Sequence, residues 1–207
     1  MARSDLRNDD ERCSDIVSQF LDKHFYCGCK SFERVYDKSR QVKGSDVIFT
    51  MGSRSYNCDE KAAIRYVNKG LKTFSLELSF INTRGELTQG WLIDPTKVND
   101  SFLFIWIDKA KHDMLTSVDD IQVMEVSLVR KVKIMEYLES IGWTQDRLAR
   151  KDSKIRNNPD ESLGDVYRNG CKFVFSEKLH EKPINVLLSR YTLAKISDIN
   201  RVFEIKK

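Results

Sequence analysis

The spacing of apolar residues predicts one helix followed by a strand-rich segment in the first 130 residues. Residues 9–25 place apolar side chains three and four positions apart, which predicts an amphipathic helix. Residues 73–81 alternate between polar and apolar side chains, as a strand with one buried face does. Residues 101–107 are almost continuously apolar, which is typical of a strand covered on both faces. Shorter apolar runs bounded by turn residues predict further strands at 32–36, 47–51, 56–64, 87–93 and 121–129.

The pattern changes after residue 130. Residues 130–141 have helical spacing and end at Gly142, and Thr144 can cap a second helix that runs to about Lys154. The remaining segments are predicted as a loop at 156–170, strands at 171–176 and 184–190, and a weak helix at 193–203. This order favours an α+β or α/β fold with a mixed β-sheet core flanked by helices. With no repeat and no strong linker, residues 1–207 are expected to form a single domain.

Composition limits the classes of protein that fit this chain. The 207 residues are 41% hydrophobic and 32% charged, which suits one domain with a filled core and a well-solvated surface. Apolar runs fall short of the roughly 20 residues that a membrane helix needs, and the N-terminus is too polar for a secretory signal. Five irregularly spaced cysteines indicate reduced thiols. We therefore expect a cytoplasmic protein without a membrane partner.

Charge is compatible with a nucleic-acid partner but does not require one. The formal net charge is +4, far below that of proteins that bind nucleic acid by charge alone. Basic side chains concentrate in residues 130–156. They form either a solvated helical surface or a surface that contacts phosphates.

The residues with the clearest chemical potential lie around the strand predicted at 47–51. Asp46 precedes this strand, and Asp59 and Lys61 lie in the next one. Residues i and i+2 of a strand share a face, so Asp59 and Lys61 would point the same way and Glu60 the opposite way. If the two strands pair as a hairpin, both carboxylates and the ammonium group converge. Two carboxylates can bind Mg²⁺, and a nearby lysine can orient a water or stabilise charge on a phosphate.

Two alternatives remain open at this level. The run from Asp59 to Ala63 also reads as a helix start with Asp59 as N-cap, which would make Asp59 and Lys61 ordinary surface charges. Glu77, on the polar side of the strand at 73–81, is either part of a solvated face or a third carboxylate near a metal.

The run Gln41-x-x-Gly44-x-Asp46, followed by Asp59-x-Lys61, resembles the PD-(D/E)XK nuclease-like superfamily, including some microbial and phage-type members. Ser45 stands where proline often occurs, and the resemblance covers residues 8–110. It implies a restriction-endonuclease-like core, with helical and strand additions at 111–207. It also implies that Asp46 and Asp59 bind Mg²⁺ or Mn²⁺ and that Lys61 is catalytic. Gln41 is then expected to take part in catalysis by positioning one of these three residues. Members of this superfamily often carry another acid on the first helix, for which the candidates are Asp9, Asp10, Glu11 and Asp15.

The function implied by the resemblance is metal-dependent hydrolysis of phosphodiester bonds, in DNA rather than RNA, by an endonuclease or exonuclease. The alternative is a catalytically inactive module that binds nucleic acid or a protein on the same fold, because a fold does not determine a function.

Overall fold

The computed structural model describes the backbone of residues 3–162 and 170–205, and side chains from residue 10 within these ranges. It divides into two compact units that alternate along the chain. The first comprises Met1–Leu71, Asn99–Val129 and Ser197–Lys207, and the second comprises Lys72–Val98 and Arg130–Ile196. Each unit contains its own β-sheet. The assignment of residues 1–207 to one domain stays a prediction.

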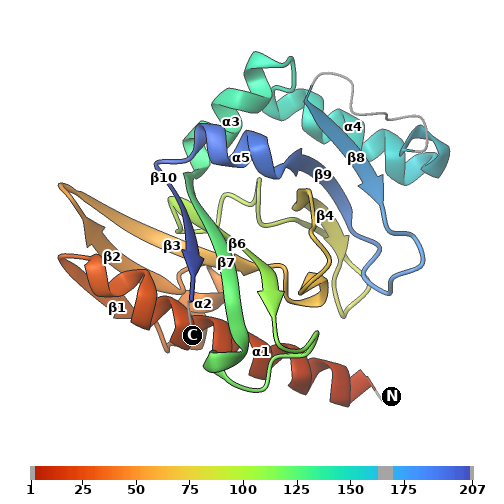
Figure 1. The fold of residues 1–207 in the computed structure, drawn as a ribbon. Coiled ribbons are helices and arrows are strands. Elements are labelled where there is room, and N and C mark those ends of the chain that lie inside the picture. Colours follow the sequence, from red (N-terminus) through yellow and green to blue (C-terminus); the bar gives the residue numbers. More distant parts are fainter. Residues whose placement is uncertain (1–2, 163–169, 206–207) are drawn as a thin grey trace. The chain divides into compact units, whose positions relative to one another are not determined.

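The first unit is built on a six-stranded mixed sheet, with the strand order β1-β2-β3-β6-β7-β10 (Figure 1). Its strands are β1 (Ser31–Arg34), β2 (Val47–Met51), β3 (Arg54–Ala62), β6 (Ser101–Ala110), β7 (Ile121–Arg130) and β10 (Ile199–Glu204). β3 and β6 run parallel, whereas the pairs β1–β2, β2–β3 and β7–β10 are antiparallel. The predicted mixed sheet flanked by helices is therefore confirmed. The sheet also extends beyond the predicted core of residues 8–110, because β7 and β10 belong to it.

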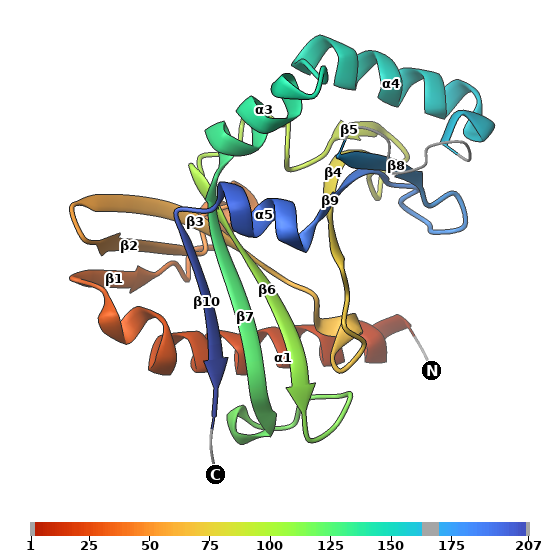
Figure 2. The same cartoon turned by 45° about the horizontal axis from the view of Figure 1, so that its top comes forward.

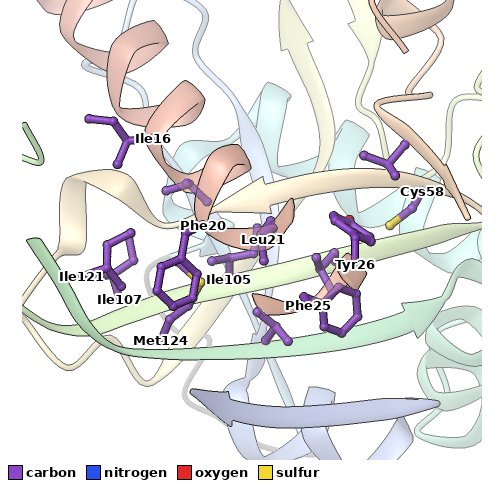
Figure 3. Close-up of a cluster of buried hydrophobic side chains, with 14 of the residues drawn as sticks. Ile16, Phe20, Leu21, Phe25, Tyr26, Cys58, Ile105, Ile107, Ile121 and Met124 are labelled. Atoms are coloured by element: carbon purple, nitrogen blue, oxygen red, sulfur yellow. The ribbon is translucent and has the colours of Figure 1, made fainter. Parts of the chain in front are cut away.

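Helix α1 (Arg3–His24) lies along one face of this sheet (Figure 2). Its apolar stripe includes Ile16, Phe20 and Leu21, which belong to the same buried cluster as Ile105 and Met124 of the strands (Figure 3). The predicted amphipathic helix is confirmed, and it begins several residues before the expected start. Burial of this stripe is what holds a helix of modest intrinsic propensity in place. The short helix α2 (Lys38–Val42) and the 3₁₀ turns η1 (Tyr26–Gly28), η2 (Ile64–Tyr66) and η3 (Val118–Asp120) complete the first unit.

A buried polar network fixes α1 to the sheet. The Glu60 carboxylate accepts hydrogen bonds from the Tyr26 hydroxyl at 2.7 Å and from the Arg34 guanidinium at 3.0 Å. Arg34 also donates to Asp22 at 2.8 Å and to the Ser18 carbonyl at 2.9 Å, both on α1. Burial raises the pKa of Glu60, and the charge and hydrogen bonds of Arg34 oppose that effect. Glu60 therefore points toward α1, on the face of β3 opposite to Asp59 and Lys61.

The second unit contains a four-stranded sheet of order β5-β4-β9-β8. Its strands are β4 (Thr73–Ile81), β5 (Leu87–Gln89), β8 (Cys171–Phe175) and β9 (Ile184–Ser189), and its helices are α3 (Lys131–Ser140), α4 (Gln145–Asn157) and α5 (Arg190–Ile196), with the 3₁₀ turn η4 (Pro159–Ser162). Thr144 caps α4 by accepting a hydrogen bond from the Arg147 amide, as the sequence predicts. Asp152 and Arg156 of α4 both hydrogen-bond to Ser79 of β4.

Three sequence-based predictions need correction. Residues 193–203 do not form one helix, because α5 ends at Ile196 and β10 pairs with β7 from Ile199 onward. The open edge of β7 offers backbone hydrogen bonds that a weak helical pattern cannot match. β6 continues to Ala110 instead of ending at residue 107, and β5 is shorter than the strand predicted at 87–93. Of the loop predicted at 156–170, residues 163–169 lie outside the described part of the chain.

All five cysteines are free thiols, and three of them, Cys13, Cys58 and Cys171, are buried. Within residues 3–162 and 170–205, no helix is both long enough and apolar enough to span a lipid bilayer.

Candidate active site

The β2–β3 hairpin brings Asp46 and Asp59 together. Val47 pairs with Cys58 in this antiparallel ladder, so the preceding residue, Asp46, lies across from Asp59. Residues directly opposite each other in an antiparallel pair point to the same face. The predicted extended, paired conformation is confirmed from Asp59 to Ala62. The alternative, in which Asp59 caps a helix, is wrong, because β2 and β6 pair with β3 on both sides and satisfy its backbone.

The two carboxyl groups interact directly, and this interaction changes the acidity of Asp46. Burial, and next the negative charge of Asp59, raise the pKa of Asp46 to about 6. A hydrogen bond from the Glu60 amide to Asp46 Oδ2, at 2.9 Å, and the charge of Lys61 oppose this rise. Two neighbouring carboxylates with little access to water resist simultaneous ionisation. The pair is therefore a site where a cation would be favoured.

Lys61 is the third member of the predicted constellation. Its Nζ lies 2.8 Å from Asp59 Oδ1. The Asp59 side chain is 6% exposed and the Lys61 side chain 26% exposed, so the ammonium group lies between a buried carboxylate and solvent. The structure thus brings Asp46, Asp59 and Lys61 to one face of β3, as the i, i+2 spacing predicts.

Gln41 has a different environment. It lies in α2, and its Nε2 donates a hydrogen bond to the Val35 carbonyl at 2.8 Å. The backbone carbonyl of Gln41 accepts a hydrogen bond from the backbone amide of Gly44, also at 2.8 Å. These contacts hold the segment that leads into Asp46. A direct role of Gln41 in catalysis stays a prediction.

Two further residues shape the site, and one of them, Asn99, has no marker in the sequence. Asn99, just before β6, is 4% exposed and donates from Nδ2 to the Ser101 carbonyl at 3.2 Å. Gly44 has a φ of +83°, and a Cβ placed on it would lie 2.6 Å from Asn99 Oδ1 and 3.4 Å from Asp59 Oδ2. Both oxygens therefore face the space that a side chain at position 44 would fill. Gly44 belongs to the run Gln41-x-x-Gly44-x-Asp46. Asn99 has no such local pattern, because the parallel pairing of β3 with β6, and not its own sequence neighbours, brings Asn99 to Asp59.

The other candidate acids belong to other structural elements. Glu77 belongs to β4, in the sheet of the second unit. Asp10 forms an ion pair with Arg65, and α1 packs on the face of the sheet opposite to Asp59. The side chain of Asp9 lies outside the described residues. Across the described part of the chain, His, Cys, Asp and Glu side chains do not form a metal-binding group of three or more. The site offers the two carboxylates, and the amide oxygen of Asn99 lies near Asp59. Oxygen ligands of this kind are the type preferred by Mg²⁺ and Mn²⁺.

Comparisons of the chain with models of known protein families, with curated proteins and with solved structures find no match.

A substitution at Gly44 should reveal how tightly this site is packed. We expect Gly44→Ala to destabilise the protein by about 2 kcal/mol or more, because it combines a left-handed backbone with a close approach to Asn99. Gly52→Ala is the matched control, since Gly52 has a φ of +62° but no atom within 4 Å of its added Cβ. Urea denaturation of both variants measures the difference. Equal losses of stability would show that position 44 can accept a side chain.

Proposed function

We propose that this protein is a metal-dependent nuclease that hydrolyses phosphodiester bonds in DNA, on a restriction-endonuclease-like arrangement of its first unit. The observation that carries this proposal is the convergence of Asp46, Asp59 and Lys61 on one face of the β2–β3 hairpin. Two carboxylates beside an ammonium group provide a cation site next to a positive charge that can contact a phosphate.

Asp46 and Asp59 would hold the divalent cation, Mg²⁺ or Mn²⁺. The fit is supported by the raised pKa of Asp46, which results first from burial and then from the charge of Asp59, because a bound cation would offset both effects. It is also supported by the absence of a side chain at Gly44, which leaves room beside Asp59 Oδ2. When bound, the ion supplies Lewis acidity and offsets negative charge on the phosphate.

The residues of the chain would share the remaining tasks. Lys61, held by Asp59 at 2.8 Å and partly exposed, can donate a hydrogen bond to a phosphate oxygen or orient the attacking water. Hydrolysis adds water across one P–O ester bond, so that phosphorus gains a hydroxyl and the leaving oxygen gains a proton. Gln41 would hold α2 and the entry to the hairpin in place through its bond to Val35.

The basic residues of α4 include some that are bonded within the second unit and some whose side chains are exposed. Arg156 donates to Ser79 and to the Lys182 carbonyl, and Lys151 donates to the Glu161 carbonyl, so these charges have structural contacts within the second unit. Arg150 and Lys154 are exposed. We propose that such exposed charges contribute sequence-independent phosphate contacts, whose strength should fall as salt rises. The reduced cysteines favour action in the cytoplasm.

The test is a cleavage assay with plasmid, linear duplex, single-stranded and branched DNA, and with RNA. We expect cleavage of DNA with Mg²⁺ or Mn²⁺ and none with EDTA. An Asp46→Ala preparation, purified in the same way, excludes a contaminating nuclease. If the wild type binds nucleic acid but cleaves none of these substrates with either metal, the non-enzymatic binding module replaces the nuclease proposal.

A further inference from the structure

Asn99 contains a buried oxygen that the protein leaves without a partner. Among the described residues, Asn99 Oδ1 is the buried side-chain oxygen or nitrogen for which no hydrogen bond is found. Leaving a buried acceptor unsatisfied is costly because it loses its hydrogen bonds to water, so such atoms are rare in native proteins and call for an explanation. The opposite end of the same amide is satisfied, because Nδ2 donates to the Ser101 carbonyl. That bond orients the amide with Oδ1 away from Ser101.

The unpartnered oxygen lies close to Asp59. The same point beside Gly44 lies 2.6 Å from Asn99 Oδ1 and 3.4 Å from Asp59 Oδ2. The other oxygen of Asp59, Oδ1, contacts Lys61 Nζ. The two oxygens of the Asp59 carboxylate therefore have different neighbours. Oδ1 contacts the Lys61 ammonium group, and Asn99 Oδ1 lies on the side of Oδ2. An ion on the Oδ2 side would not have to displace Lys61.

We infer that Asn99 supplies, through Oδ1, the third protein oxygen of the cation site formed by Asp46 and Asp59. This inference rests on the proposed function, because it concerns the same metal. A neutral amide oxygen is a suitable third ligand, since two carboxylates already balance the charge of a divalent cation and a third would add repulsion in the empty site. Bound metal would also give Asn99 Oδ1 the partner that the described residues do not supply.

The test measures metal binding directly, with Mn²⁺ as the probe and calorimetry as the readout, on protein stripped with EDTA. We expect Asn99→Ala to weaken Mn²⁺ binding by about tenfold or more, within the range known for residues that support metal sites. Asn99→Asp should bind Mn²⁺ at least as tightly as the wild type, because it keeps an oxygen although it loses the Nδ2–Ser101 hydrogen bond. Asn200→Ala is the control. Asn200 lies on the edge strand β10 and donates to Glu125 and Ser127, so its loss should leave Mn²⁺ affinity unchanged.

The outcomes separate this inference from the proposed function. If the wild type binds no Mn²⁺, or if Asp46→Ala binds it equally well, the metal site itself is wrong. If Asp46→Ala loses binding but Asn99→Ala keeps wild-type affinity, only the role of Asn99 is overturned. Equal weakening in Asn99→Ala and Asn99→Asp would also overturn it, because the bond to Ser101 would then be what matters. If Asn99→Ala does not fold, Asn99→Asp is used instead. The increase in Tm that Mn²⁺ produces in Asn99→Asp should equal or exceed the increase in the wild type. A smaller increase refutes the inference.

Discussion

Lys61→Ala is expected to reduce the rate of DNA cleavage by about 10²-fold or more, the scale of losing one positioned catalytic group. Metal binding should stay at least as tight as in the wild type, because the variant removes a positive charge 2.8 Å from Asp59 Oδ1. DNA binding should change little. Lys109→Ala is a matched control, since it removes an exposed lysine from the neighbouring strand β6. Single-turnover cleavage beside a calorimetric Mn²⁺ titration measures both quantities.

Unlike Lys61→Ala, substitutions of the two carboxylates should also weaken metal binding. Asp46→Ala and Asp59→Ala should both weaken metal binding strongly and abolish cleavage, because a hard cation loses a charged oxygen ligand. The separation between the lysine and the two acids is the diagnostic result. If Lys61→Ala cleaves DNA at the wild-type rate, or loses metal binding along with the acids, the proposed division of roles is incorrect.

Asp46→Asn is expected to stabilise the metal-free protein at neutral pH by up to about 3 kcal/mol, although it removes a proposed metal ligand. Burial and the charge of Asp59 raise the pKa of Asp46 from an ordinary 3.8 to about 6. A tenfold change in proton affinity corresponds to about 1.4 kcal/mol. The native protein holds this proton more tightly than the unfolded chain, so the unfolding free energy decreases as pH rises from about 4 to about 6. Asparagine has no charge to desolvate and keeps an oxygen for the Glu60 amide.

Urea denaturation in EDTA at pH 4 and at pH 7.5 measures this effect. The two proteins should have similar stability at pH 4, and the variant should be more stable at pH 7.5. Adding Mg²⁺ should narrow the gap at pH 7.5, because only the wild type gains stability from binding it. Asp100→Asn is the control, since Asp100 also accepts a backbone hydrogen bond, from Asn57 at 3.2 Å, but is exposed. A wild type as stable as Asp46→Asn at both pH values would show that the pKa of Asp46 is not raised in the folded protein.

Local periodicity was sufficient for the elements that bury one continuous face. The three- and four-residue spacing in α1 and the alternation in β4 each predict the apolar face of the element, and that information lies within one segment. Ser79 of β4 departs from the alternation, because it is buried beside an irregularity in the pairing of β4 with β9. The period of two in a strand likewise puts Asp59 and Lys61 on one face and Glu60 on the other. Strand β10 has no such pattern, because an edge strand with exposed side chains has little hydrophobic periodicity and forms by pairing with β7.

The amino-acid sequence by itself therefore determined the mixed α and β class and the identities of Asp46, Asp59 and Lys61 as a candidate site. Only the tertiary structure decided that Asp59 is in a strand instead of capping a helix, because the choice depends on hydrogen bonds to β2 and β6. Only the tertiary structure assigned β4, and Glu77 with it, to a separate sheet. It alone placed Asn99 beside Gly44 and Asp59, since the parallel pairing of β3 with β6 joins residues that no local pattern connects.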